Sequence, residues 1–168
     1  MMKYAPLFAK AAWTTLGIGA AGIFLSFLAG LVISVIRYRK IPFLLPLSTA
    51  YVELSRNTPL LVQLFFLYFG LPKAGIHISG ETCAAVGLTF LGGSYMAEAL
   101  RSGIESVSVS QYESAAALGL TEHQIFRFVL LPQAFTVSLP PLCANVLFLI
   151  KETSIFSVCA VPAVPAVA

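Results

Sequence analysis

The sequence predicts an all-α protein, a bundle of about four membrane-spanning helices in a single domain that covers residues 1–168. Composition is the first reason: 58% of the 168 residues are hydrophobic and only 10% are charged, whereas soluble domains carry about 25% charged residues. The length of the apolar runs is the second, because about 20 such residues are needed to cross the hydrocarbon core. The third is that the ten basic and seven acidic residues gather in a few short segments instead of coating a surface.

The first predicted span covers residues 11–36. It follows Lys3 and Lys10, as the apolar core of a signal peptide would, but it is longer than the roughly 7–15 residues of such a core. Small residues recur along it at every fourth position, at Gly22, Ser26, Gly30 and Ser34. Because a stripe of small residues lets another helix approach closely in lipid, we expect a close helix–helix contact there.

A basic segment follows the first span. The densest positive charge of the chain lies here, at Arg37, Arg39, Lys40 and Arg56. Since cytoplasmic loops carry an excess of lysine and arginine, this places residues 37–58 in the cytoplasm and the N-terminus outside. Pro42 and Pro46 break the segment, which we expect to lie along the membrane interface. The second predicted span, residues 58–73, is short, so flanking residues and neighbouring helices have to complete the crossing.

The third and fourth predicted spans cover residues 82–101 and 132–150. Glu98 and Arg101 share one helix face. Either they form an ion pair at the membrane edge, or Glu98 faces a translocation cavity, since ionisable groups in membrane segments often line a path. In the fourth span Pro140-Pro141 removes two backbone donors, and the freed carbonyls are tolerated only beside protein or a wet cavity. Candidate residues of a solute path are therefore Glu98, Asn145, Lys151 and Glu152.

The polar loop between the third and fourth predicted spans is typical of two short helices joined by a turn. Ser110 and Glu113 have the spacing of a capping box, which starts a helix. Gly119 can adopt the left-handed conformation that ends a helix, and Thr121 with Gln124 repeats the capping-box spacing. A small helix with an almost bare alanine face, held between two spans, is expected to dock against another protein.

Seven residues of this loop and of the start of the fourth span follow a specific order: Glu113, Ser114, Ala115, Gly119, Val129, Leu131 and Pro132. They resemble the EAA signature of the permease subunits of ATP-binding-cassette (ABC) importers. Ser114 departs from the signature, which usually has alanine there, but serine is also small. Residues 51–64, 130–134 and 149–154 are similar to the polar amino acid branch of that family. The resemblance implies that the loop, residues 102–131, couples the permease to an ATPase.

The resemblance also implies the fold of a type I importer permease. Such permeases usually continue through a fifth helix, and the proline-rich residues 159–168 are atypical of one, so we expect the fifth span to be missing. The implied partners are cytoplasmic ABC ATPase subunits, a periplasmic or surface-anchored solute-binding protein, a second permease subunit (the same or a homologous chain) and membrane lipid. The implied place is the bacterial cytoplasmic (inner) membrane. A truncated or inactive permease that acts only as a scaffold or assembly subunit is the alternative.

Other classes of protein are disfavoured by the sequence. It contains no phosphate-binding loop, no His-Glu-x-x-His and no Gly-x-Ser-x-Gly, so we expect a transporter subunit and not an enzyme, with ATP hydrolysed by the partner. No cofactor or metal is expected, because the three cysteines lack a Cys-x-x-Cys spacing and lie in apolar context. No nucleic acid is expected either: residues 105–127 hold three glutamates and one arginine, whereas phosphate binding requires clustered lysine and arginine.

Overall fold

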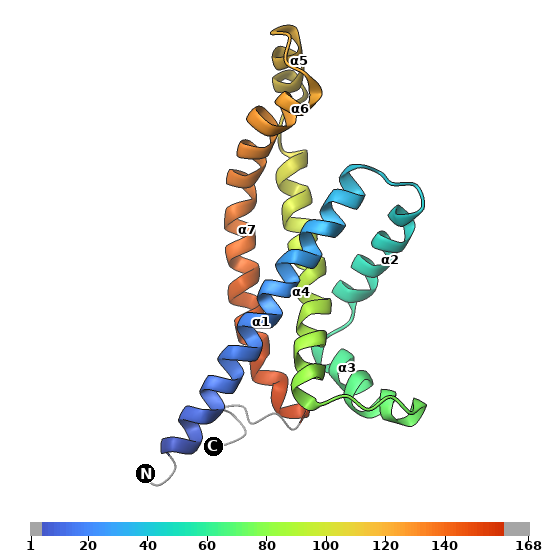
Figure 1. The fold of residues 1–168 in the computed structure, drawn as a ribbon, viewed down its shortest axis with the longest axis vertical. Helices are drawn as coiled ribbons and strands as arrows, with labels where there is room; N and C mark the ends of the chain where they lie inside the picture. Colours follow the sequence, from blue (N-terminus) through green and yellow to red (C-terminus); the bar gives the residue numbers. More distant parts are fainter. Residues whose placement is uncertain (1–4, 160–168) are drawn as a thin grey trace.

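The computed structural model describes residues 5–159, which are helical and contain no strand (Figure 1). The α-helices, in chain order, are α1 (Ala5–Tyr38), α2 (Leu44–Asn57), α3 (Leu60–Phe65), α4 (Gly80–Glu105), α5 (Val109–Ala117), α6 (Glu122–Ile125) and α7 (Leu131–Glu152). Two π-helical segments, η2 (Phe66–Gly70) and η4 (Phe126–Leu130), and two 3-10 segments, η3 (Leu71–Ala74) and η5 (Thr153–Cys159), extend them. The predicted all-α class is confirmed. The predicted atypical tail lies, from residue 160 onward, outside the described residues.

Within residues 5–159, three stretches of helix are long and apolar enough to cross a membrane: Ala9–Tyr38, Gly80–Glu105 and Glu122–Cys159. They coincide with the first, third and fourth predicted spans. The second predicted span coincides with Leu60–Ala74, which is apolar but shorter. By the length and composition of its helices the chain is a multi-pass membrane protein.

Helix α4 lies at the centre of the bundle, with α1 crossing it and α7 running along it (Figure 1). In α4, 67% of the most apolar stretch is buried, against 22% in the stretches that contain α1 and α7. The apolar core gathers around α4, where Leu88 joins Leu64 of α3, Leu149 of α7 and Phe156 of η5, all fully buried. The other helices are therefore held together mainly by their contacts with α4.

The small-residue stripe of α1 faces α4, as the sequence predicts. A Cβ atom added at Gly30 would lie 2.5 Å from the Cβ of Met96 and 2.9 Å from the backbone nitrogen of Ala97. Ser26 is fully buried, and its hydroxyl donates a hydrogen bond to the carbonyl of Leu88 (3.2 Å). The two backbones approach so closely that a larger side chain at Gly30 would collide with α4.

The segment that we expect along the membrane interface is a helix, α2, that runs beside α4 (Figure 1). The Tyr51 hydroxyl donates to the carbonyl of Phe90 (2.6 Å), and the Ser55 hydroxyl donates to the same carbonyl (2.8 Å). Phe90 lies near the middle of α4. These two bonds tie α2 to the backbone of α4 and satisfy both hydroxyl groups without water. Where the segment lies relative to the membrane interface stays a prediction.

Helices α2 and α3 meet at a break. After Asn57 the backbone of Thr58 is extended, with φ −113° and ψ 120°, and α3 begins at Leu60. The Gln63 amide closes the break, since its nitrogen donates to the carbonyls of Ser55 (3.2 Å) and Thr58 (2.9 Å). The bounds of the second span stay a prediction, and this arrangement favours a crossing that begins with α2.

Helix α7 stays helical through Pro140 and Pro141, both of which are exposed. It approaches α4 most closely at Gly103, where an added Cβ would collide with the Ser138 hydroxyl and the Ala134 carbonyl. The double proline thus lies away from the contact that joins α7 to α4.

Candidate functional site

The predicted cytoplasmic loop forms one end of the molecule, where α5 and α6 project beyond the ends of α4 and α7 (Figure 1). The last turn of α1 reaches it. The rings of Tyr38 and Phe126 lie 5.9 Å apart between centroids, and Arg39 lines a cavity with Tyr112 and His123 of the loop. Tyr38 and Arg39, at the end of α1, therefore lie at the same end of the bundle as the loop, as the predicted orientation requires, whereas Arg56 lies at the far end of α2, beside the break that leads into α3.

The turn between α5 and α6 forms as predicted. Gly119 has a φ of 81°, in the left-handed region that a residue with a side chain occupies only with strain. Helix α6 then starts with the predicted capping box: the Thr121 hydroxyl accepts from the Gln124 backbone N–H (3.4 Å), and the Gln124 side-chain oxygen accepts from the Thr121 N–H (2.9 Å). Local hydrogen bonds thus fix the direction of α6.

The other predicted capping box, between Ser110 and Glu113, is wrong. Helix α5 begins one residue before Ser110, at Val109, because Ser108 already has the extended backbone of an N-cap residue, φ −66° and ψ 143°. No side-chain hydrogen bond caps this helix; the Ser108 hydroxyl lies 3.1 Å from the Ser110 hydroxyl instead. The Glu113 residue is exposed at the surface of α5.

The seven signature residues divide by exposure. Ala115 is buried, with 5% of its surface exposed, and Val129 is half-buried. Exposed members are Glu113, Ser114, Gly119, Leu131 and Pro132. Next to the turn, the large apolar side chain of Leu118 is 81% exposed. One face of α5 thus packs against the loop, and the rest is open.

A side-chain contact joins α5 to α7. The Gln133 amide nitrogen, in the first turn of α7, donates to the side-chain oxygen of Gln111 in α5 at 2.5 Å. The backbone N–H of Leu120 also donates to the carbonyl of Ala115 (3.3 Å), closing the end of α5. The loop is therefore tied to the helix that follows it.

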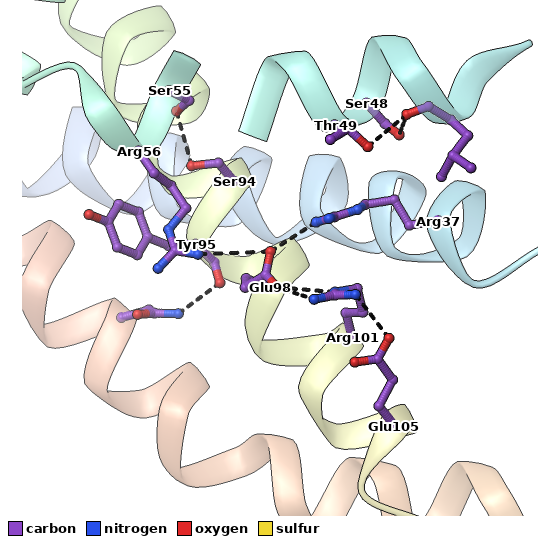
Figure 2. Close-up of polar contacts among 12 residues, drawn as sticks. Arg37, Ser48, Thr49, Ser55, Arg56, Ser94, Tyr95, Glu98, Arg101 and Glu105 are labelled. Atoms are coloured by element: carbon purple, nitrogen blue, oxygen red, sulfur yellow. Dashed lines mark hydrogen bonds and ion pairs between the residues drawn. The ribbon is translucent and has the colours of Figure 1, made fainter. Parts of the chain in front are cut away.

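Below the loop, a cluster of charged side chains joins α1, α2 and α4 (Figure 2). Its centre is Glu98. One carboxylate oxygen of Glu98 accepts from Arg37 of α1 at 2.8 Å, and the other accepts from Arg101, one turn along α4, at 2.8 and 3.0 Å. Arg101 also donates to Glu105 (2.9 Å). The predicted ion pair of Glu98 with Arg101 is confirmed, and it is part of a larger network.

A third arginine, Arg56 of α2, approaches the same carboxylate more loosely. Its guanidinium lies 3.8 Å from the nearer oxygen of Glu98 and stacks over the Tyr95 ring, 5.2 Å from the centroid (Figure 2). Such stacking of an arginine on an aromatic face is favourable. Both oxygens of Glu98 are already bonded to Arg37 and Arg101, so Arg56 is held mainly by the ring.

The four candidate path residues do not contact one another through any hydrogen bond or ion pair within residues 5–159. Glu98 is in the charged cluster. Asn145 donates to the carbonyl of Tyr95 (3.1 Å), which ties α7 to α4. Lys151 is exposed, and Glu152 is half-buried and lines a cavity beside α3. Their role in a solute path stays a prediction.

Sequence reasoning missed the roles of Arg37 and Arg56. Both contribute to the basic segment and were interpreted only as markers of orientation, whereas the structure brings them to Glu98 from two different helices. The signal that could have found them is the single acidic residue, Glu98, in the third span, because a carboxylate there requires cationic partners.

A bundle of apolar helices around α4, with two short exposed helices at one end, defines a multi-pass membrane protein of the permease class. The chain belongs to the family described as the binding-protein-dependent transport system inner membrane component, whose model matches residues 22–162.

Two curated relatives are similar along most of the chain. The probable glutamine ABC transporter permease protein GlnM of Bacillus subtilis strain 168 is 43% identical over 135 residues, which are 80% of this chain and 62% of GlnM. The probable amino-acid ABC transporter permease protein PatM of Vibrio harveyi is 38% identical over 158 residues, 92% of this chain and 71% of PatM. The chain therefore spans about two thirds of the length of these relatives, and the predicted family and its amino acid branch are confirmed.

Solved structures agree. The crystal structure of an amino acid ABC transporter with histidines matches with a TM-score of 0.90 and 34% identity, covering 98% of this chain and 77% of that one. An inward-facing structure of the MetNI methionine ABC transporter matches with a TM-score of 0.71 at 24% identity, covering 90% of this chain and 73% of that one. The second likeness shows the shared fold alone.

Proposed function

We propose that the chain is a membrane-spanning subunit of an ATP-driven importer of polar amino acids in the bacterial inner membrane. It lines the translocation path, and the loop of α5 and α6 receives the movement of a cytoplasmic ATPase. The observation that carries the proposal is this loop, which is held firmly to the bundle at its base and exposed at its tip.

The exposed tip has the composition of a docking surface. Val109 and Leu118 are 72% and 81% exposed, and the Glu113 carboxylate lies between them in sequence. Val109 begins α5 and Leu118 follows its end, so large apolar side chains are exposed at both ends of this helix, which supports a protein interaction site there. The small side chains of Ser114 and Ala116 allow a partner to approach the backbone of α5, as the resemblance to the EAA signature implies.

The base of the loop supports its use as a lever. The capping box of α6, the left-handed Gly119 and the bond from Gln133 to Gln111 fix α5 and α6 relative to α7. The loop also continues directly from α4, whose Glu98 is tied to α1. A displacement of the loop by the ATPase would therefore reach α7 and α4 together, and α1 through the charged cluster.

The remaining partners follow from the family. A solute-binding protein delivers the solute at the end opposite the loop, and a second permease subunit completes the path. The apolar side chains of Trp13, Phe24 and Val32 on α1 are 80%, 63% and 62% exposed, which suits contact with lipid or with that second subunit. The names of the relatives, a probable glutamine permease and a probable amino-acid permease, support polar amino acids as the solute.

The test is stimulation of the ATPase by loaded binding protein in reconstituted vesicles, with all subunits from the same genome. We expect Glu113→Ala to lower the stimulation about tenfold, as the loss of a hydrogen bond to a charged group would. We expect Gly119→Val to abolish it, because a β-branched residue at that φ is strained and the change would redirect α6.

Matched controls exist at the opposite end of the bundle. Gly75 has a φ of 85° with open space around it, so Gly75→Val introduces the same strain away from the loop. Glu81→Ala likewise removes an exposed carboxylate from the first turn of α4. If both loop variants stimulated the ATPase as the wild type does, the loop would not be the element that couples the permease to the ATPase. A wild-type chain that assembles and never stimulates would favour the scaffold alternative.

A further inference from the structure

A cavity of about 650 Å³ lies between the end of α1 and the loop of α5 and α6. Its volume is within the range of about 300–1,000 Å³ that is usual for small-molecule sites. The polar residues that line it come from the end of α1, from α5 and from α6: Tyr38, Arg39, Tyr112, Glu122 and His123. Coupling to an ATPase uses the exposed tip of the loop and leaves this cavity without a role.

Two side chains of opposite charge line this cavity, and neither is neutralised by an ion pair within residues 5–159. Arg39 and Glu122 are both exposed, and the ion pairs of the described chain involve other residues. A simple anion would suit Arg39 and be repelled by Glu122, and a simple cation would meet the opposite difficulty. A ligand that carries an anionic group and a separate ammonium group would satisfy both side chains.

The other polar groups of the cavity favour a phosphate as the anionic part of the ligand. Tyr38 and Tyr112 each bring a hydroxyl, and His123 brings an imidazole, so each can donate a hydrogen bond. The Arg39 guanidinium can donate two parallel bonds to one phosphate. A phosphate offers more acceptor oxygens than a carboxylate, which suits this number of donors.

The surroundings of the cavity indicate that its ligand comes from the membrane. The cavity lies where the apolar stretch Ala9–Tyr38 ends and the apolar stretch Glu122–Cys159 begins. In the turn after α1, Ile41 is exposed and Phe43 is 86% exposed, and two basic residues precede them. Exposed apolar side chains next to lysine and arginine at the end of a span are typical of contact with phospholipid headgroups.

We infer that this cavity binds the headgroup of a phosphatidylethanolamine lipid from the leaflet on the side of the loop, with the phosphate on Arg39 and the ammonium group on Glu122. Phe126 and Leu130, which also line the cavity, would contact the first part of the acyl chains. The lipid would join the end of α1 to α5 and α6, so the position of the loop would depend on the membrane around it. The inference goes beyond the proposed function and does not rest on it.

The test is lipid binding to the full chain in detergent, measured by native mass spectrometry. Phosphatidylethanolamine is the probe. It is compared, with the same acyl chains, with phosphatidylcholine, whose methylated ammonium group cannot donate a hydrogen bond, and with phosphatidylglycerol, which has no ammonium group. The wild type should bind one molecule of phosphatidylethanolamine about tenfold more tightly than either of the other lipids, which corresponds to one hydrogen bond to a charged group.

Each variant has its own signature. Glu122→Gln should lose the preference for phosphatidylethanolamine, because the neutral amide no longer attracts the ammonium group. Arg39→Gln should bind all three lipids about tenfold less well and keep the preference. Glu122→Asp and Arg39→Lys retain the charges and should retain part of the affinity and the order of the three lipids.

Two matched controls remove exposed charges of the same signs outside the cavity. They are Arg127→Gln, in η4, and Glu81→Gln, in the first turn of α4. Both should bind the three lipids as the wild type does. Equal binding of the three lipids by the wild type would overturn the inference, and so would an unchanged preference in Glu122→Gln or an unchanged affinity in Arg39→Gln.

Two further measurements distinguish the lipid from other ligands of the same cavity. Glycerophosphoethanolamine has the same headgroup without acyl chains, and it should compete at least about tenfold less well, since buried acyl chains add to binding. Competition as strong as that of the lipid would assign the cavity to a soluble phosphodiester and overturn the membrane source. Loss of the bound lipid when the ATPase subunits are added would assign the cavity to that partner and overturn the inference as well.

Discussion

Helix α4 and the loop of α5 and α6 adjoin in the sequence and are opposite in character. The buried residues of α4 include both small and large apolar side chains, and α4 contacts every long helix of the bundle. Most of its apolar stretch is buried. In the loop only Ala115 and Ile125 are buried, and Leu118 is 81% exposed. Helix α4 is thus held by close packing, whereas the loop is held mainly by the hydrogen bonds at its base.

This difference implies that stability and coupling are separable. Substitutions in the contacts of α4 should unfold the bundle, whereas substitutions at the tip of the loop should leave the fold unchanged and affect only the partner. The charged cluster lies between the two regions and should show an intermediate effect. Three predictions follow this order.

The largest effect is expected for Gly30→Leu. The side chain would collide with Met96 and the backbone of Ala97, and because a backbone contact cannot yield, we expect a loss of about 3 kcal/mol or more in the free energy of unfolding. Thermal unfolding in detergent measures it. Gly17→Leu is the matched control, since Gly17 lies on the same helix with nothing within 4 Å of its position for a Cβ. Equal melting temperatures for the two variants would contradict the close packing of α1 on α4.

An intermediate effect is expected for Glu98→Gln. The neutral amide would leave Arg37, whose side chain is only 14% exposed, without its carboxylate, and we expect a loss of about 1–3 kcal/mol. Glu105→Gln is the control: Glu105 is 59% exposed, and exposed pairs contribute only about 0–1 kcal/mol. Chemical unfolding of both variants in detergent provides the comparison. A larger loss for Glu105→Gln would mean that the cluster is not centred on Glu98.

The smallest effect on stability is expected for Leu118→Ala. Because Leu118 is 81% exposed, the change should alter the free energy of unfolding by less than about 0.5 kcal/mol, while it weakens the binding of the isolated ATPase subunit. Leu149→Ala, at a position with no exposed surface, should cost about 2–5 kcal/mol. ATPase binding by surface plasmon resonance, together with unfolding, measures both. If Leu118→Ala destabilised the protein about as much as Leu149→Ala, the Leu118 side chain would have to be buried, which would contradict the exposed loop of the structure.

The long helices and the loop were predictable because each depends on local signals. Apolar runs of sufficient length mark α1, α4 and α7, and Gly119 with the Thr121 capping box marks the turn, since both act over three or four residues. The stripe that begins at Gly22 was predictable for the same reason, because its period places it on one helix face.

Features that depend on distant partners were not predictable. The position of α2 is decided by Tyr51 and Ser55, which bond to a carbonyl of α4 some 35 to 39 residues later in the chain. The sequence alone does not show which carbonyl is within reach. The convergence of Arg37 and Arg56 on Glu98 has the same origin, as does the cavity between the end of α1 and the loop. The Ser110 capping box failed for a local reason, because two neighbouring serines compete for the same position.

The π-helical segment η4, between α6 and α7, makes the direction of the loop sensitive to chain length. Each residue of an α-helix turns the chain by about 100°, and a π-helical turn accommodates one residue more than an α-helical turn. Deletion of a single codon within Phe126–Leu130 would allow an ordinary α-helix to form there, and it would rotate the loop by roughly a quarter of a circle about the axis of α7. Every residue of the docking surface would still be present, but it would face a different direction.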